Sequence, residues 1–124
     1  MTDPKRLLVV DDEPLLVRIL QHLLTRSGFA VTTALDGREA LQRVQEQRFD
    51  LVLSDVKMPV MDGAAFVQAL QRLPDPPPVV FLTGYGDHTD PYLRSLGARA
   101  VVGKPVAPSV LLDLIAQHAR SHAR

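Results

Sequence analysis

Residues 51–63 read LVLSDVKMPVMDG, and this stretch sets the pattern for the whole chain. Residues 51–53 form a short apolar run, which is typical of a strand that is buried on both faces. Asp55 follows at the end of this strand, and Pro59 and Gly63 then mark a loop that leads to a helix. Because open α/β sheets bind ligands at the carboxyl ends of their strands, Asp55 is a candidate ligand-binding residue.

Short apolar runs alternate with stretches of helical periodicity along the chain. The expected strands cover residues 7–10, 30–34, 51–54, 79–82 and 100–102. The expected helices begin near the capping residues Asp12, Asp36 and Ser109, and in the ranges 65–73 and about 88–95. Their apolar faces are expected to include Leu16, Ile19, Leu20 and Leu23, then Ala65, Phe66, Ala69, Leu70 and Leu73, and finally Val110, Leu111, Leu114 and Ile115. The pattern predicts an α/β fold with a doubly wound, five-stranded parallel sheet in the order 2-1-3-4-5, the flavodoxin-like (βα)5 arrangement.

The composition narrows the class of protein. With 124 residues the chain suits one domain, and we expect residues 5–119 to form its core and residues 120–124 a tail or the start of a linker. The formal net charge is zero, which gives no reason to expect nucleic acid or a membrane as a direct partner. No cysteine is present, and no apolar segment approaches the roughly 18–20 residues that span a bilayer, so we expect a cytoplasmic protein.

Polar side chains follow four of the expected strands, and the strand order brings them to one edge of the sheet. Asp11 and Asp12 follow the first strand, and Asp55 follows the third. Thr83 ends the fourth strand, and Lys104 follows the fifth. Because the first, third and fourth strands are neighbours in this order, we expect the five side chains to meet in one shallow pocket.

The chemistry of this set favours a divalent cation and phosphoryl transfer. Carboxylates that lie close together repel one another, and their hard oxygen ligands suit Mg²⁺, or alternatively Mn²⁺. A carboxylate oxygen is a competent nucleophile toward phosphorus, while the Lys104 ammonium and the Thr83 hydroxyl can stabilise the negative charge. No histidine or further carboxylate is obviously placed as a general base, so we do not expect fast hydrolysis.

With these residues the chain resembles a response-regulator receiver domain of bacterial two-component signalling. The resemblance runs from Leu7 to about Ala119, and its motifs are Asp11-Asp12, the run from Asp55 to Gly63, Thr83 after an apolar strand, and Lys104-Pro105. Each motif is weak alone, but their order at the ends of successive strands makes the combination specific.

The resemblance implies a role for each residue of the set. Asp55 would be the phosphoacceptor and also a ligand of the metal. Asp12 would bind Mg²⁺ directly and Asp11 through water, and the backbone carbonyl of Lys57 would be a further ligand. Thr83 would move toward the phosphoryl group.

Lys104 would pair with that phosphoryl group, and its peptide bond to Pro105 is expected to be cis. One position departs from the family pattern, because Val101 replaces the aromatic residue usual on the fifth strand. The nearest aromatic candidate for a signalling role is Tyr85.

The resemblance also implies the function and the partners. The chain would take a phosphoryl group from a sensor histidine kinase or a phosphotransfer protein and would then switch a protein-interaction face. It would not be an enzyme beyond self-phosphorylation from small donors and slow autodephosphorylation. An output domain or a target protein would receive the signal. A phosphorylation-dependent homodimer would form through the fourth helix, the fifth strand and the fifth helix.

Three other classes of protein compete with this interpretation. A haloacid-dehalogenase-type phosphatase needs a second Asp two residues after its nucleophile, which the Asp11-Asp12-Glu13-Pro14 run does not supply. A flavodoxin-like electron carrier needs a Ser/Thr-rich phosphate loop, whereas the loop after the first strand here is acidic. A phosphorylation-independent pseudo-receiver that acts only as a protein-binding module stays open as the alternative.

Overall fold

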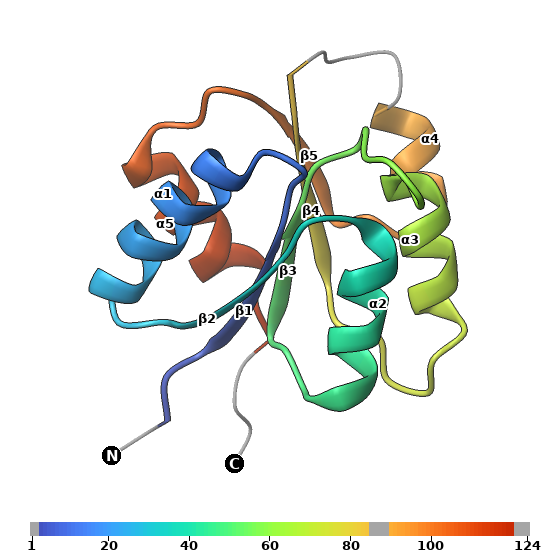
Figure 1. Ribbon diagram of the computed structural model, residues 1–124, viewed down its shortest axis with the longest axis horizontal. Helices are drawn as coiled ribbons and strands as arrows, with labels where there is room; N and C mark the ends of the chain where they lie inside the picture. Colours follow the sequence, from blue (N-terminus) through green and yellow to red (C-terminus); the bar gives the residue numbers. More distant parts are fainter. Residues whose placement is uncertain (1–2, 85–89, 121–124) are drawn as a thin grey trace.

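The parallel sheet has the strand order that the sequence predicts (Figure 1). The structure is a computed structural model that describes residues 3–84 and 90–120. Its strands are β1 (Arg6–Val10), β2 (Ala30–Ala34), β3 (Leu51–Ser54), β4 (Val79–Thr83) and β5 (Ala100–Gly103), in the order β2-β1-β3-β4-β5. All four pairings are parallel. The predicted doubly wound α/β fold is therefore confirmed.

Helices cover both faces of the sheet. They are α1 (Pro14–Arg26), α2 (Gly37–Glu46), α3 (Gly63–Gln71), α4 (Asp90–Ser95) and α5 (Pro108–His118). Figure 1 shows α1 and α5 on one face and α2, α3 and α4 on the other. The fourth helix was expected to begin near His88, which lies outside the described residues. No helix in the described part of the chain is long and apolar enough to cross a bilayer.

The central strands are buried on both faces because helices pack on each side. Successive residues of β1 alternate between two hydrophobic clusters, as the period-2 geometry of a strand requires. Leu8 and Val10 pack with α2, α3 and α4, whereas Leu7 and Val9 pack with α1 and α5. All four are at most 1% exposed, which explains why the strand sequences are continuously apolar.

Two of the three predicted helix caps need correction. The Asp36 carboxylate accepts the Glu39 N–H at 2.8 Å, and the Glu39 carboxylate accepts the Leu35 N–H at 2.7 Å, so the predicted capping motif at α2 is confirmed. Asp12 and Ser109 are not caps. Helix α1 begins at Pro14 and helix α5 at Pro108, and the fixed φ of proline suits this first position. The residues before them, Glu13 and Ala107, make no side-chain cap.

The predicted apolar faces of three helices also need correction. Ile19 is 55% exposed and Val110 is 45% exposed, although both were assigned to buried faces. In α1 the buried positions are Val17 and Leu24, so the inward stripe is rotated relative to the predicted one. In α3, Ala65 is exposed and Val67 is buried together with Phe66 and Leu70, so the inward stripe is also shifted there.

Candidate functional site

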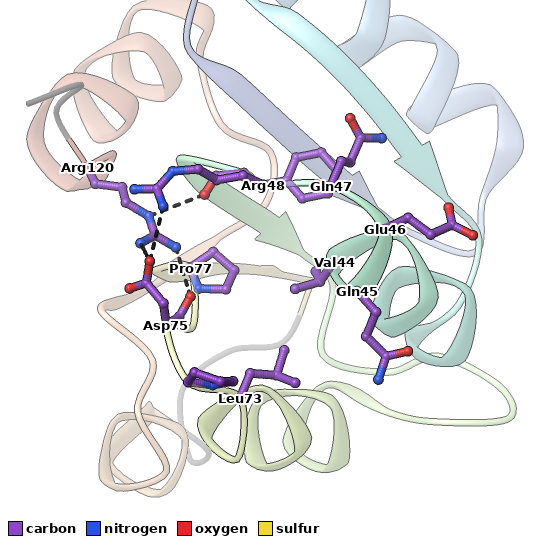
Figure 2. A pocket seen from close by; sticks show the side chains of 11 residues that line it. Val44, Gln45, Glu46, Gln47, Arg48, Leu73, Asp75, Pro77 and Arg120 are labelled. Carbon is purple, nitrogen blue, oxygen red and sulfur yellow. Dashed lines mark hydrogen bonds and ion pairs between the residues drawn. The ribbon is translucent and has the colours of Figure 1, made fainter.

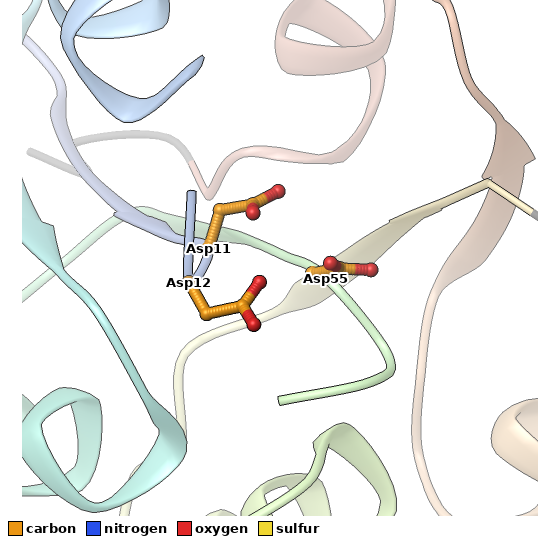
Figure 3. A group of neighbouring side chains, drawn as sticks. All are labelled: Asp11, Asp12 and Asp55. Atoms are coloured by element: carbon orange, nitrogen blue, oxygen red, sulfur yellow. The ribbon is translucent and has the colours of Figure 1, made fainter. Parts of the chain in front are cut away.

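Three carboxylates meet at the carboxyl edge of the sheet (Figure 3). Val10 of β1 is in register with Ser54 of β3, so Asp11 and Asp55 leave the sheet side by side. The Asp55 N–H donates to the Val10 carbonyl at 2.9 Å, which extends this pairing by one residue. One carboxylate oxygen from each of Asp11, Asp12 and Asp55 lies within 4.8 Å of the others.

Lys104 brings a positive charge to the same edge from β5. Its Nζ donates to Oδ2 of Asp11 at 2.7 Å and lies 3.5 Å from Oδ2 of Asp55. The Lys104 backbone N–H donates to the Thr83 carbonyl at 2.7 Å, which ties the end of β5 to the end of β4. The Lys104–Pro105 bond is cis, as predicted.

Backbone amides orient two of the acids. The Val56 N–H donates to Oδ1 of Asp55 at 2.7 Å, and the Glu13 N–H donates to Oδ1 of Asp11 at 3.1 Å. Each of these carboxylates therefore has one oxygen held by an amide and the other, Oδ2, beside Lys104. Asp12 differs, because its side chain is exposed.

Burial and charge act in opposite directions on these groups. Burial raises the pKa of Asp55, the Lys104 ammonium lowers it, and the Asp11 carboxylate raises it again, with the result that the pKa lies above its ordinary value. For Lys104, burial lowers the pKa, but the hydrogen bond and charge of Asp11 and the charge of Asp55 raise it more. Burial is thus the main reason that the pKa of Asp55 is raised, and a cation bound beside the three acids would favour the ionised carboxylate.

The loop after Asp55 is fixed by close backbone contacts that local sequence patterns did not reveal. The Gly63 N–H donates to the Val56 carbonyl at 2.7 Å, and a Cβ on Gly63 would lie 2.6 Å from the Phe81 ring. On the other side of the loop, a Cβ on Gly37 would lie 2.5 Å from the Met61 carbonyl oxygen. Both glycines therefore permit the approach that positions this loop.

A helix cap and a tight turn further define the loop. The Asp62 carboxylate accepts the Ala65 N–H at 2.9 Å, so this residue caps α3. Val60 has a φ of 70°, and the Met61 N–H donates to the Pro59 carbonyl at 2.7 Å, a γ-turn of the strained kind. Met58, in the same loop, is buried.

The remaining residues that the sequence singled out lie on β4, on β5 and in the loop after Asp55. Thr83 is buried at the end of β4 and is in register with Gly103. Lys57 is exposed on the loop after Asp55. Val101 on β5 is half-buried and packs against the cluster under α2, α3 and α4. Tyr85 lies outside the described residues.

The donor set fits the metal that the sequence predicts. Its carboxylate oxygens are hard ligands of the kind that Mg²⁺ prefers, and the exposed Asp12 leaves room for waters to complete the coordination. Within residues 3–84 and 90–120 this is the one group of three such acids that are close enough to share an ion.

A separate cavity of about 430 Å³ lies at the opposite, amino edge of the sheet (Figure 2). There Oδ2 of Asp75 forms ion pairs with the guanidinium groups of Arg120, at 2.9 Å, and of Arg48, at 3.1 Å. The Arg120 guanidinium also donates to the Phe49 and Asp75 carbonyls, and its backbone N–H donates to the Asp50 carbonyl. This cavity is thus remote from the acid cluster, and its ion pairs hold the end of α5 to the neighbouring loops.

Comparisons with known proteins agree on one family. The family model of the response regulator receiver domain matches residues 7–116. The alkaline phosphatase synthesis transcriptional regulatory protein PhoP of Bacillus subtilis is 39% identical over 84% of this chain and 44% of its own length. The probable transcriptional regulator ycf27 of Cyanophora paradoxa is 43% identical over 86% of this chain and 45% of its own. The chain therefore spans less than half of these two relatives.

Solved structures give the same result. The chemotaxis protein CheY4 of Vibrio cholerae superposes with a TM-score of 0.85 and 36% identity, covering 93% of this chain and 98% of that one. The signal receiver domain of a histidine kinase from Syntrophus aciditrophicus gives a TM-score of 0.82 and 34% identity, covering 91% and 88%. From the fold, the acid cluster and these matches we conclude that the chain belongs to the response regulator receiver domain family of two-component signalling.

Proposed function

We propose that this receiver domain accepts a phosphoryl group on Asp55 in a Mg²⁺-dependent reaction. The donor would be the phosphohistidine of a sensor kinase or of a phosphotransfer protein, or a small molecule such as acetyl phosphate. The observation that carries the proposal is the meeting of Asp11, Asp12 and Asp55 within 4.8 Å, with Lys104 in contact with two of them.

The residues divide the chemistry between them. An Asp55 carboxylate oxygen attacks phosphorus, the bond from phosphorus to the donor imidazole nitrogen breaks, and an acyl phosphate forms while the imidazole keeps the electron pair. When bound by Asp11, Asp12, Asp55 and the Lys57 carbonyl, Mg²⁺ would neutralise charge on the transferring group. Lys104 and Thr83 would supply the remaining positive charge and hydrogen bond.

The partly buried position of the Asp55 side chain supports its role as the acceptor. Its side chain is 13% exposed, so part of the carboxylate stays open to a donor. The Val56 N–H meanwhile holds Oδ1 in place. A carboxylate with a raised pKa is also a stronger nucleophile once it is ionised. We expect slow autodephosphorylation, because the two carboxylates placed beside Asp55 in the described residues, those of Asp11 and Asp12, would be engaged by the metal.

The consequences for signalling belong to the same proposal. Thr83 and Lys104 stand at the ends of β4 and β5, so contacts to a phosphoryl group would bias the segments that follow these strands. The surface of α4, β5 and α5 is then the expected output face and the face of a phosphorylation-dependent homodimer. An output domain or target protein would read this face, and the protein would work in the cytoplasm.

Mass spectrometry of the intact chain tests the proposal. After incubation with acetyl phosphate and Mg²⁺ we expect the wild type to gain one phosphoryl group, and to gain none when EDTA replaces Mg²⁺. Asp55→Asn should gain none, while Asp113→Asn, which changes an exposed acid on α5, should behave as the wild type. Equal phosphorylation of Asp55→Asn would exclude Asp55 as the acceptor, and no phosphorylation of the folded wild type would favour the pseudo-receiver instead.

A further inference from the structure

The chain is held firmly at the point where it leaves α5. Arg120 lies just beyond this helix, and the preceding residue, Ala119, already has an extended backbone with φ of −66° and ψ of 141°. The Arg120 N–H donates to the Asp50 carbonyl at 3.0 Å, and the Arg120 carbonyl accepts Nζ of Lys5 at 3.0 Å. Both backbone polar groups of this residue are therefore paired with segments that are distant in the sequence.

The Arg120 side chain adds further contacts (Figure 2). Its Nε donates to the Phe49 carbonyl at 3.3 Å, and its Nη2 donates to the Asp75 carbonyl at 3.2 Å. Its Nη1 lies 2.9 Å from Oδ2 of Asp75, and only 20% of the side chain is exposed. The planar guanidinium makes these bonds at the same time because its N–H groups point in different directions. We call the contacts of Arg120 with Lys5, Phe49, Asp50 and Asp75 the Arg120 clamp.

The partners in the Arg120 clamp belong to the framework of the sheet. Phe49 and Asp50 are buried and directly precede β3, and Lys5 directly precedes β1. Asp75 lies in the run PDPPP of residues 74–78, where the fixed φ of each proline stiffens the loop. The clamp therefore ties the end of α5 to the beginnings of the two strands that carry the acid cluster at their other ends.

Apolar packing holds the end of α5 only weakly. Leu111 and Ile115 are the buried residues of this helix, and Gln117 in its last turn is exposed. Ala119 is only partly buried against the cluster under α1 and α5. The cavity of about 430 Å³ beside the clamp leaves room for the Arg120 side chain to move away from its partners without repacking of the core. The last turn of α5 thus depends largely on the polar contacts of the clamp.

We propose that the Arg120 clamp is a two-state device that fixes the position from which the chain leaves the domain. With the clamp closed, the segment after residue 120 starts from a set point at the amino edge of the sheet, opposite the acid cluster. With the clamp open, the last turn of α5 frays while the sheet stays folded, and the same segment becomes a loose tether. The state of the clamp therefore decides whether that segment moves together with the receiver domain.

Amide hydrogen exchange followed by NMR tests the proposal in the isolated, unphosphorylated chain. In the wild type the Arg120 amide should exchange at least about tenfold more slowly than in an unfolded chain, because it donates to the Asp50 carbonyl. Arg120→Ala keeps this N–H but removes the side-chain contacts, so protection at positions 119 and 120 should fall about tenfold. The Val52 amide, which donates to the Pro78 carbonyl, should keep its protection because the opening is local.

Matched variants separate the geometry of the guanidinium from its charge. Arg120→Lys keeps the charge, but a single ammonium cannot donate at once to the Phe49 carbonyl and to the backbone and side chain of Asp75, so it should not restore protection. Asp75→Asn should lower protection less than Arg120→Ala, because the Asp75 backbone carbonyl remains as an acceptor. Arg43→Ala is the control, since it removes a guanidinium that pairs with two glutamates within α2, and it should leave positions 119 and 120 unchanged.

A distance measurement tests the position of the helix end, as distinct from the stability of the fold. The chain has no cysteine, so Gln117→Cys on α5 and Gln68→Cys on α3 allow spin labels to be attached at two exposed sites alone. The distribution of distances from double electron–electron resonance should be narrow in this background and should broaden when Arg120→Ala is added. A contact that only stabilised the fold would leave the distribution unchanged.

Four results would each overturn the proposal. The Arg120 amide could exchange as fast as in an unfolded chain, or protection at positions 119 and 120 could be equal in the wild type and Arg120→Ala. The distance distribution could stay the same in Arg120→Ala, or protection could fall equally throughout β3 and β4, which would make the clamp one more contribution to global stability. Asp55→Asn should give wild-type exchange at both positions, so failure of this proposal and failure of the phosphorylation proposal are seen separately.

Discussion

Gly63→Ala is predicted to destabilise the domain and to weaken its metal site. An added Cβ would lie 2.6 Å from the Phe81 ring, 3.0 Å from the Asp55 carbonyl oxygen and 3.0 Å from Cα of Val56. Two of these three neighbours are backbone atoms, and the Phe81 ring is fully buried, so no side chain can rotate out of the way. Overpacking of this kind costs about 1–3 kcal/mol.

A smaller term acts in the opposite direction. Alanine is favoured over glycine in the middle of a helix by roughly 0.5–1 kcal/mol, and by less at the first residue of α3, so we expect a net loss of about 1–2 kcal/mol in the free energy of unfolding. Gly103→Ala is the matched control, because no atom lies within 4 Å of its added Cβ. That variant should change stability by less than about 1 kcal/mol, and in the stabilising direction.

Urea unfolding with EDTA present measures both variants. The displaced atoms belong to Asp55 and Val56, so Gly63→Ala should also lower Mg²⁺ affinity and the rate of phosphorylation by acetyl phosphate, whereas Gly103→Ala should not. A Gly63→Ala variant as stable as the wild type, with unchanged Mg²⁺ affinity, would refute the claim that this glycine positions the loop.

Three further predictions concern the charged groups. Asp55→Asn should stabilise the metal-free protein at neutral pH, as measured by urea unfolding, because burial raises the pKa of Asp55 and so disfavours its ionised form. This gain in the free energy of unfolding should be absent below the unfolded pKa of 3.8 and should appear as the pH rises from there through the raised folded pKa. The hydrogen bond and ion pair with Arg120 lower the pKa of Asp75, so the ionised Asp75 stabilises the fold above pH 3.8, and this stabilisation is lost as the pH falls through the lower folded pKa. A carboxyl titration by NMR should show a midpoint below 3.8, and Arg120→Ala should raise it. Asp12→Ala should weaken Mg²⁺ binding more than Asp11→Ala in calorimetric titration, and equal affinity of Asp12→Ala and wild type would exclude Asp12 as a direct ligand.

Local signals in the sequence were sufficient to predict a structural feature where a residue and its partner are close in the chain. Asp36 and Glu39 predicted the start of α2 because a capping motif needs only neighbouring residues. The three acids were expected to meet because a parallel sheet fixes which strand ends are neighbours, and they lie within 4.8 Å of one another. The meeting of the acids therefore followed from the strand order and from the position of each Asp at the end of a strand.

Features that depend on contacts between distant segments could not be predicted in this way. The rotation of α1 that exposes Ile19 is set by how that helix packs on the sheet, which its own periodicity does not specify. Gly37 and Gly63 are constrained by atoms of Met61 and Phe81, and no pattern around either glycine indicates this. The closer approach of Lys104 to Asp11 than to Asp55 likewise depends on the three-dimensional positions of three strand ends.

Identification of the phosphorylated residue tests the central claim most directly. After acetyl phosphate treatment, borohydride reduces an acyl phosphate to an alcohol and converts the acceptor aspartate to homoserine, which peptide mass spectrometry can locate. We predict homoserine at position 55, only when Mg²⁺ is present, with Asp11 and Asp12 unchanged. Homoserine at position 11 or 12, or none in a folded protein supplied with Mg²⁺, would contradict the assignment of Asp55 as the phosphoacceptor.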